Sequence, residues 1–460
     1  MADVRELAQA HLVPHFTRRT AWQSSRLPVI VRGDGCYVYD DRGQRFLDGL
    51  SGLFCVNLGH GRTDIVAAAA KQMETLAYAT NWSAAHPASA EAATLIAEAA
   101  PGDLDAVFFV NSGSEAVESA IKFARQYHRS QGQPGRTKII ARDMAYHGTT
   151  MGALSVTGIP AYREPFEPLL PGVIRVPNTL GAAAGGGSVR DLACVRAIEE
   201  AIEREGAETI AAIFAEPVQN GRGALVPPPG YWAELRAICD RTGTLLVADE
   251  VINGFGRLGE WFGVDREGVV PDLLTFAKGS TSGYAPLGGL VVRRALAEAV
   301  FSGPDGSFAH GATWGGHPVA TAVAVATVNA LRSEQVLDNV RRLGPMLGQG
   351  LRDIVRRHPT LREVRGTGFF YALEFMADRD SGEELSGEQS LALLREILPA
   401  AMRRAGLLTR PDDRGATMLV LAPPLVADRA VLDELLGQVD AVAGEADRFI
   451  RGSGPRPGPR

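Results

Sequence analysis

The sequence predicts an α/β fold, with a large domain on a mostly parallel sheet and a smaller α+β domain formed by the two chain ends. Its central part contains short apolar runs with little polar alternation, which is typical of strands buried on both faces of a sheet. Helix-like amphipathic segments separate these runs, as crossover helices separate parallel strands. At 460 residues the chain is long enough for two domains.

The N-terminal region predicts three short strands, Val29–Val31, Cys36–Tyr39 and Arg45–Leu47, separated by turn-forming residues. From about Gly59 the apolar runs begin, and an amphipathic stretch from Ser114 to about Ser130 predicts a helix. The runs that predict buried strands are Ala106–Val110, Lys138–Ala141, Val173–Val176, Ile210–Ala215, Leu245–Ala248 and Leu273–Phe276.

After about Leu331 the pattern predicts a long helix (Glu334–His358), a strand pair near Val364–Phe375 and a closing helix (Asp428–Ile450). We therefore assign residues 59–330 to the large domain, and residues 1–58 and 331–460 to the small one. Two segments are predicted to be irregular because of their composition: Gly181–Ser188 as a flexible surface loop, and 452–460 as a disordered tail.

Charge and cysteine usage exclude several classes of protein. With 47 basic and 53 acidic residues, the net charge is -6, which does not indicate the basic surface typical of a nucleic-acid-binding protein. The four cysteines are widely spaced, which argues against a metal site or a disulfide framework and favours a reducing cytoplasm. The segment Met1–Thr17 has no apolar stretch typical of a secretory signal, and no run is long enough to span a membrane.

Lys278 is one of only four lysines in a chain with 43 arginines. It directly follows the predicted strand Leu273–Phe276, at the edge where open α/β sheets bind ligands. Arginine supplies charge but cannot form an imine with an aldehyde, so an amine is indicated here. The alternative is an ordinary surface lysine at a strand end.

Asp249 and Glu250 follow another predicted strand, Leu245–Ala248. Two adjacent acids at the end of a buried strand are costly unless a positive group meets them. A protonated pyridine ring would do so, and a helix cap or a structural ion pair is the alternative.

Two weaker motifs lie between strands and helices. Ser112-Gly113-Ser114 would let backbone N–H groups approach a phosphate at a helix start, although the same residues also suit a helix cap. Tyr146-His147-Gly148 could place an aromatic ring against a flat cofactor. The glycine fingerprint of a nicotinamide dehydrogenase and a Walker loop are both absent.

Taken together in this order and spacing, these motifs closely resemble those of the class III aminotransferases, the ω-transaminase branch of the fold-type I enzymes that use pyridoxal 5′-phosphate (PLP). The resemblance runs from about Leu27 to about Leu425 and implies a seven-stranded sheet in the large domain. The further motifs that carry it are Ser51-Gly52-Leu53, Glu216-Pro217-Val218-Gln219, Thr313, Gly316-His317-Pro318 and Ala422-Pro423-Pro424-Leu425.

The resemblance implies two catalytic residues. Lys278 would hold PLP covalently and move the substrate proton, and Asp249 would pair with the ring nitrogen. Tyr146 and Val251 would cover the two faces of the ring. The other cofactor-binding residues that it implies are Ser112, Gly113, Ser114, His147, Glu216, Gln219 and Thr313.

The resemblance also implies substrates and a partner. Thr313 would reach the cofactor phosphate of a neighbouring subunit, which implies a homodimer with shared sites or a higher oligomer. Phe54 and Trp82 would lie at the substrate pocket. Arg410, on a loop longer than usual, would pair with the carboxylate of a keto acid, with Arg414 and a plain surface arginine as alternatives.

The implied reaction transfers an amino group from an amine or ω-amino acid to a keto acid such as pyruvate, by a ping-pong mechanism. Other PLP reactions on the same scaffold, namely racemisation, aminomutase chemistry or decarboxylation, would use the same Lys278 and Asp249. A binding protein that has lost catalysis is disfavoured because both residues are present.

Overall fold

The computed structural model describes residues 4–23, 28–180, 192–303 and 306–452. The predicted loop Gly181–Ser188 and residues 453–460 of the predicted tail lie outside these ranges. The helices are α1 (Val4–His11), α2 (Arg19–Gln23), α3 (Ser51–Phe54), α4 (Thr63–Thr75), α5 (Pro87–Ala99), α6 (Gly113–Ser130), α7 (Met151–Val156), α8 (Pro160–Arg163), α9 (Ala193–Glu205), α10 (Tyr231–Thr242), α11 (Arg294–Phe301), α12 (Pro318–Ser333), α13 (Val336–Arg357), α14 (Gly387–Ala392), α15 (Leu398–Ala405) and α16 (Arg429–Ile450).

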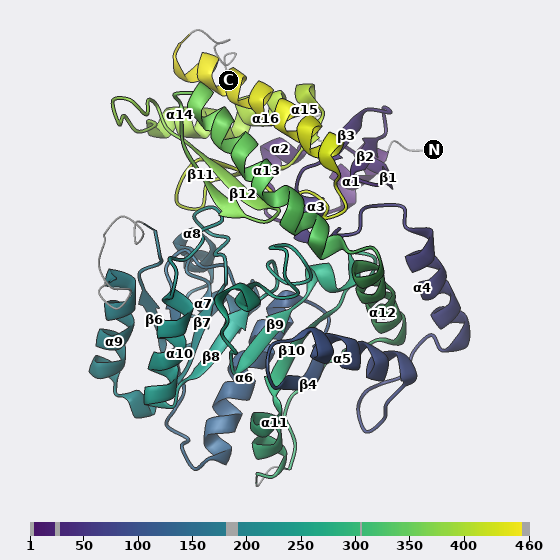
Figure 1. Cartoon of the computed structure of the whole chain (residues 1–460), viewed down its shortest axis with the longest axis vertical. Coiled ribbons are helices and arrows are strands. Elements are labelled where there is room, and N and C mark those ends of the chain that lie inside the picture. The colour runs from purple at the N-terminus through teal and green to yellow at the C-terminus, as the bar shows by residue number, and fades with distance from the viewer. Residues whose placement is uncertain (1–3, 24–27, 181–191, 304–305, 453–460) are drawn as a thin grey trace.

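A seven-stranded sheet forms the centre of the lower part of the molecule in Figure 1, with the order β4-β10-β9-β8-β7-β5-β6. Its strands are β4 (Leu104–Val110), β5 (Lys138–Arg142), β6 (Val173–Val176), β7 (Ile210–Ala215), β8 (Leu245–Asp249), β9 (Leu273–Phe276) and β10 (Gly288–Arg293). Only β10 runs antiparallel to its neighbours, so the prediction of a mostly parallel seven-stranded sheet is confirmed.

Both faces of this sheet are buried, as the apolar runs predict. Along β8, Leu245 and Val247 pack into a cluster that contains residues of α6, α7 and α11. Leu246 and Ala248 point to the opposite cluster, which contains residues of α5, α9, α10 and α12. Alternate side chains of one strand thus enter two apolar layers, which explains the absence of polar alternation.

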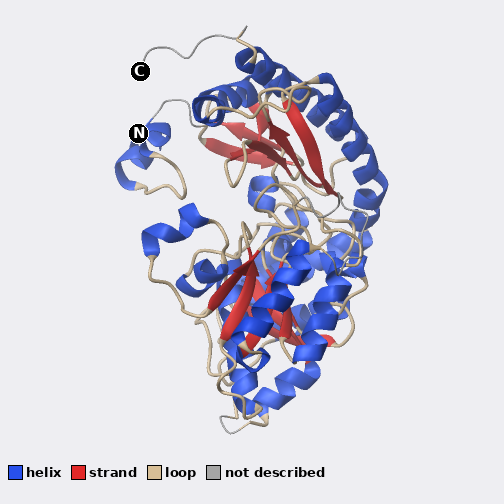
Figure 2. Cartoon of the chain, turned by 90° about the vertical axis from the view of Figure 1, so that its left-hand side faces the viewer, coloured by secondary structure: helices blue, strands red, loops and turns tan. Residues whose placement is uncertain are grey.

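Two smaller four-stranded sheets lie in the upper part of Figure 1, and Figure 2 shows them apart from the large one. Their strands are β1 (Ile30–Asp34), β2 (Tyr37–Asp40), β3 (Arg45–Asp48) and β13 (Leu407–Leu408) in one, and β11 (Leu361–Thr367), β12 (Phe370–Phe375), β14 (Arg410–Asp412) and β15 (Met418–Leu421) in the other. Because β13 pairs with β3, the first sheet joins the two ends of the chain. This pairing supports the domain division that we propose.

Arg410 does not lie on a loop, so that expectation was wrong. It opens β14, an edge strand that pairs antiparallel with β15 through Arg410–Val420 and Pro411–Leu419. Proline has no backbone N–H to donate to a neighbouring strand. An edge strand such as β14 tolerates Pro411, because one of its two sides pairs with no other strand.

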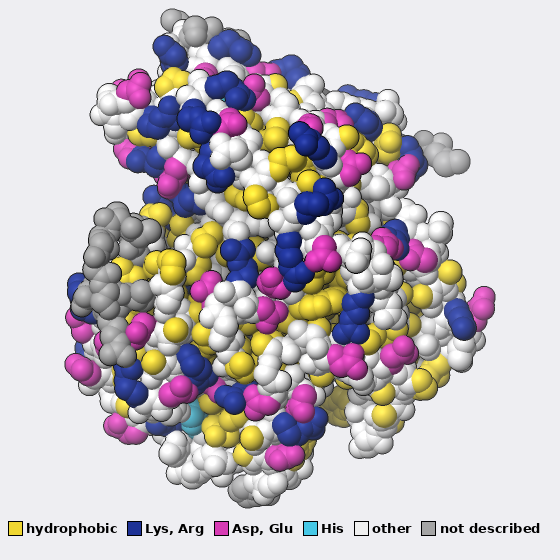
Figure 3. Space-filling view, viewed as in Figure 1, with side chains coloured by type: hydrophobic (Ala, Val, Ile, Leu, Met, Phe, Trp, Pro, Cys, Tyr) yellow, Lys and Arg dark blue, Asp and Glu magenta, His cyan; other side chains and the backbone are white. Residues whose placement is uncertain are grey.

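Within the described ranges, no helix is long and apolar enough to cross a membrane. On the face shown in Figure 3, basic and acidic side chains are interspersed, and neither sign gathers into one large patch.

Candidate active site

The predicted functional residues meet at one edge of the seven-stranded sheet. β4 runs parallel to β9 because both pair antiparallel with β10, so their carboxyl ends lie on the same side. Ser112 follows β4, Glu216 follows β7, Asp249 ends β8 and Lys278 follows β9. This is the edge at which open α/β sheets place their ligands.

Lys278 begins a short 3-10 turn and has φ +39, a left-handed conformation that is rare for a side chain of this size. Its amine makes no hydrogen bond to any described residue. Burial lowers the pKa of Lys278, although Cys55, Asp249 and Glu216 oppose this shift. A strained, unpaired lysine with a lowered pKa is suited to act as a nucleophile or base.

Asp249 is buried and held from two sides. His147 Nδ1 lies 2.7 Å from Asp249 Oδ2, while the Thr275 hydroxyl and the Val251 N–H donate to Asp249 Oδ1 at 3.0 and 3.1 Å. The imidazole of His147 is itself buried, and its Nε2 has no partner among the described residues. These contacts fix the orientation of the Asp249 carboxylate.

Glu216 and Tyr146 are joined by a hydrogen bond, because the Tyr146 N–H donates to Glu216 Oε1 at 3.2 Å. Burial raises the pKa of Glu216, although His147 and Arg142 oppose this shift. Gln219 is buried and donates to Asp143 O at 3.0 Å, while its Oε1 has no partner among the described residues.

The start of α6 lies beside this group. Ser112 caps the helix by accepting from the Glu115 N–H at 3.2 Å, and Ser114 Oγ accepts from the Thr149 N–H at 3.1 Å. A Cβ on Gly113 would lie 2.7 Å from Val251 Cγ1, so no larger residue fits there. Ser112 therefore caps α6, as the alternative interpretation holds. The N-terminus of α6, with the small residue Gly113 in its first turn, is still suited to bind a phosphate.

These residues fit PLP. The unpaired amine of Lys278 can reach an aldehyde, and the fixed carboxylate of Asp249 can meet a ring nitrogen. The N-terminus of α6 suits a phosphate. His147, which holds the Asp249 carboxylate, also keeps its Nε2 without a hydrogen-bond partner among the described residues.

A sequence model of the family "Aminotransferase class-III" matches residues 20–442 of the chain. The chain belongs to the class III aminotransferases. It is 45% identical to a probable aminotransferase of Mycobacterium tuberculosis. The alignment spans 424 residues and covers 92% of this chain and 90% of the relative. It is 38% identical to a putrescine–pyruvate aminotransferase of Pseudomonas aeruginosa, with 94% and 93% covered.

Solved structures agree with this assignment. A thermostable (S)-enantioselective ω-transaminase of Thermomicrobium roseum has a TM-score of 0.91 at 42% identity, over 97% of this chain and 99% of that one. The ω-transaminase of Pseudomonas jessenii, solved in complex with PMP, has a TM-score of 0.92 at 30% identity, over 99% and 100%. The chain is therefore a PLP-dependent aminotransferase, as the sequence predicts.

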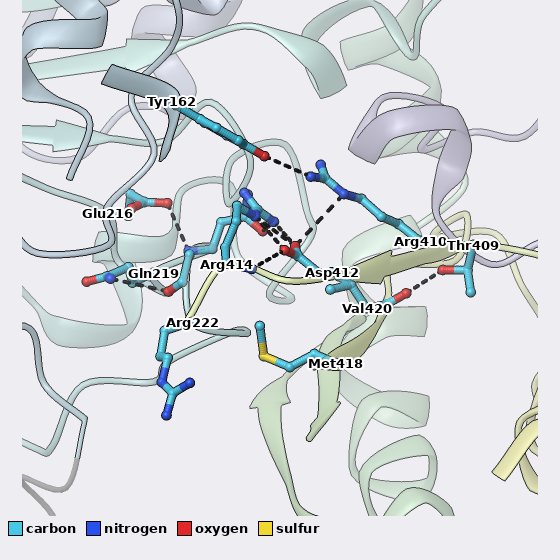
Figure 4. Close-up of polar contacts among 12 residues, drawn as sticks. Tyr162, Glu216, Gln219, Arg222, Thr409, Arg410, Asp412, Arg414, Met418 and Val420 are labelled. Atoms are coloured by element: carbon cyan, nitrogen blue, oxygen red, sulfur yellow. Dashed lines mark hydrogen bonds and ion pairs between the residues drawn. The ribbon is translucent and has the colours of Figure 1, made fainter. Parts of the chain in front are cut away.

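The two arginines of the predicted substrate region lie in different settings. Arg414 is buried and forms an ion pair with Asp412, whose two carboxylate oxygens each lie 2.8 Å from Arg414 Nε. Arg410 is half-buried, donates to the Tyr162 hydroxyl at 3.2 Å and lies 3.9 Å from Asp412 (Figure 4). Arg410 is therefore the less constrained of the two.

The other three predicted residues divide between the interior and the surface. Phe54 is buried edge-to-face against Phe370 at 5.4 Å, in a cluster that includes Val218 next to Gln219. Trp82 is 65% exposed, and its ring faces Gly311. Thr313 is exposed, and its side chain makes no hydrogen bond within the described residues.

Sequence reasoning missed three residues that the structure brings to the site: Thr275, Asp412 and Tyr162. The sequence could have indicated a functional role for Thr275, because it is the one polar residue in the apolar strand Leu273–Phe276. Nothing in the local sequence marks Tyr162, which lies in α8, far along the chain from its partner Arg410.

Proposed function

We propose that this aminotransferase transfers the amino group of an amine or ω-amino acid to pyruvate or a similar keto acid, in two half-reactions. The observation that supports this proposal is the position of Arg410, a half-buried cation that donates to Tyr162, whose ring contacts the ring of Tyr146. Such a cation can pair with the carboxylate of a keto acid. Relatives that are named for their donors include the putrescine–pyruvate enzyme and a taurine–pyruvate aminotransferase of Rhodobacter capsulatus.

The roles that we propose for the residues follow from their surroundings. Bound PLP supplies an aldehyde for the amino group and a ring that withdraws electrons from the reacting carbon. Lys278 would hold the cofactor and move the proton at that carbon, since burial lowers the pKa of its amine. Asp249 would hold the ring nitrogen, with His147 and Thr275 fixing the carboxylate.

The remaining cofactor contacts are proposed on the same basis. Ser112, Gly113 and Ser114 would hold the phosphate at the N-terminus of α6. Tyr146 and Val251 would lie against the two faces of the ring, while Glu216 and Gln219 would border its oxygen side. Phe54 and Trp82 stay as proposed pocket residues.

A donor screen tests the proposal. The purified holoenzyme, which we expect to be yellow, is incubated with pyruvate and putrescine, taurine, β-alanine, 4-aminobutyrate or 1-phenylethylamine, and alanine is quantified. We expect at least one donor to yield alanine, and a donor without pyruvate to bleach the colour. If no donor yields alanine while an amino acid is racemised or decarboxylated, the alternative PLP reactions are correct instead.

We also propose a homodimer with shared active sites. Several large apolar side chains are exposed near Thr313, among them Trp314 (62%), Trp82 (65%) and Met73 (58%). A cavity of about 340 Å³, lined by Met73, Trp314 and Asn111, opens beside the start of α6. An exposed apolar face of this kind, next to a phosphate site, is suited to a second copy of the chain.

Dimerisation and cofactor affinity should therefore be linked. If Thr313 reaches the phosphate of the neighbouring subunit, Thr313→Ala should weaken PLP retention by about tenfold, the effect of losing one hydrogen bond to a charged group. Equilibrium dialysis measures the retained PLP, and light scattering measures the dimer. A monomer that holds PLP as tightly as the wild type would contradict both parts.

Finally, we propose that the enzyme works in a reducing cytoplasm. All four cysteines are free, and three of them, Cys36, Cys194 and Cys239, are buried. Burial raises the pKa of each of these three thiols, so they are kept in the unreactive protonated form.

A further inference from the structure

Three groups lie close enough to Arg410 to decide where its guanidinium rests. The Tyr162 hydroxyl accepts a hydrogen bond from Arg410 Nη2 at 3.2 Å, while Asp412 Oδ2 is 3.9 Å from Arg410 Nε. The third group is Arg414, which lies on the other side of Asp412 and repels Arg410 (Figure 4). Of these, Tyr162 provides the only hydrogen bond to the guanidinium within the described residues.

Asp412 is not available to hold Arg410 because Arg414 occupies it. Both oxygens of Asp412 are bonded to Arg414, and the Arg414 N–H donates to Oδ1 at 2.9 Å. Arg414 is further fixed by Asn220 Oδ1 at 3.3 Å and lies over the Tyr146 ring at 5.8 Å. Burial alone would raise the pKa of Asp412, but its pairing with Arg414 outweighs this effect and lowers that pKa. Arg414 is thus a fixed cation with its charge already balanced.

Tyr162 is well placed to hold Arg410 at the substrate pocket. Its ring lies edge-on to Tyr146, at a centroid distance of 6.3 Å, and packs against Phe16 of the N-terminal segment at 5.0 Å. The backbone N–H of Tyr146 in turn donates a hydrogen bond to Glu216, at the edge of the sheet where Lys278 also lies. The phenol therefore connects the arginine to the aromatic wall of the active site.

We propose that Tyr162 is a positioning residue that holds Arg410 in the orientation that receives the carboxylate of the keto acid. This inference rests on the proposed function, which assigns the carboxylate to Arg410. The hydrogen bond to Tyr162 uses one Nη2 donor, and Nη1 makes no hydrogen bond to a described residue, so the carboxylate has donors left to meet. A single hydrogen bond to an uncharged phenol also lets Arg410 turn away when the donor is uncharged, which an ion pair with Asp412 would not allow.

Steady-state kinetics with two acceptors test this role. Pyruvate carries the carboxylate, whereas methyl pyruvate has the same reacting carbon without the charge. We expect Arg410→Ala to raise the KM of pyruvate about 10- to 100-fold, as for a lost charge-assisted pair. Tyr162→Phe keeps the ring and its packing, and should raise the KM of pyruvate about three- to tenfold. The KM of methyl pyruvate should change less than about twofold in both variants.

A double-mutant cycle separates positioning from a structural effect. In the Arg410→Ala background, Tyr162→Phe should have no further effect on the KM of pyruvate, because its influence passes through the arginine. Tyr39→Phe, in β2, removes a phenol hydroxyl elsewhere and serves as the control. An equal effect of Tyr162→Phe in both backgrounds, or a lower KM of pyruvate in the single variant, would overturn the proposal.

Binding of propionate gives a readout that does not depend on turnover. Propionate has the carboxylate of pyruvate but no carbonyl to accept an amino group. Isothermal titration of the holoenzyme should show its Kd raised about three- to tenfold by Tyr162→Phe, and not further in the Arg410→Ala background. If no donor transfers its amino group to pyruvate, the proposed function fails, yet this titration still supports or overturns the role of Tyr162. An unchanged Kd in Tyr162→Phe overturns it.

Discussion

Lys278→Ala is expected to lower kcat/KM by more than about 10⁴-fold. This single substitution removes both the covalent attachment point of the cofactor and the group that moves the proton. The rest of the pocket stays in place, since the Lys278 amine makes no hydrogen bond to a described residue that its loss would leave unpaired. Non-covalent PLP binding should therefore persist. Reduction of the holoenzyme with borohydride should fix PLP on the Lys278 peptide in the wild type and on no peptide in the variant, as read by mass spectrometry.

Lys278→Arg separates charge from chemistry. A guanidinium keeps the positive charge but remains protonated at every accessible pH, so it is neither a nucleophile nor a base. We expect the same loss of turnover as in Lys278→Ala. Lys71→Arg is the matched control, because Lys71 is exposed in α4 and should tolerate the change. Substantial transamination by Lys278→Arg would show that a different residue carries the cofactor.

Most of the large sheet was predictable because its central strands are apolar on both faces. Leu245–Ala248 and Leu273–Phe276 could be recognised as strands without knowledge of their neighbours. The antiparallel strand β10 was not predicted, because it opens with Gly288 and Gly289, which are typical of a turn. Gly289 is required for packing instead, since a Cβ there would overlap the Phe276 ring.

The site was predictable where sequence position alone brings residues together. Ser112 and Lys278 follow strands and Asp249 ends one, and parallel strands end at one edge of a sheet. The arginine region was not predictable in this way. The burial of Arg414 depends on Asp412 and Asn220, and the position of Arg410 depends on Tyr162, 248 positions away. Pairings between distant segments leave no periodic signal in a single sequence.

Asp249→Asn is expected to lower kcat by about 10²- to 10³-fold while the protein stays folded, the range measured when one electrostatic contact to a reacting group is removed. Asparagine has the shape of aspartate, and its amide oxygen can still accept from Thr275 and Val251. The His147 ring can adopt the other tautomer to face the amide nitrogen, because His147 Nε2 has no partner among the described residues that the change would disturb. The melting temperature should therefore shift little, whereas the negative charge that keeps the ring nitrogen protonated is gone.

Thr275→Val provides the control for this last prediction. Valine matches threonine in shape and removes only the hydroxyl that donates to Asp249 Oδ1, so the charge remains and the Val251 N–H still holds that oxygen. Its effect on kcat should be about tenfold, the lower end of the cost of one hydrogen bond to a charged group. Single-turnover kinetics at saturating PLP separate this loss from weaker cofactor binding. A kcat of Asp249→Asn close to that of Thr275→Val would mean that the charge of Asp249 is not what the ring requires, and that another group holds the nitrogen.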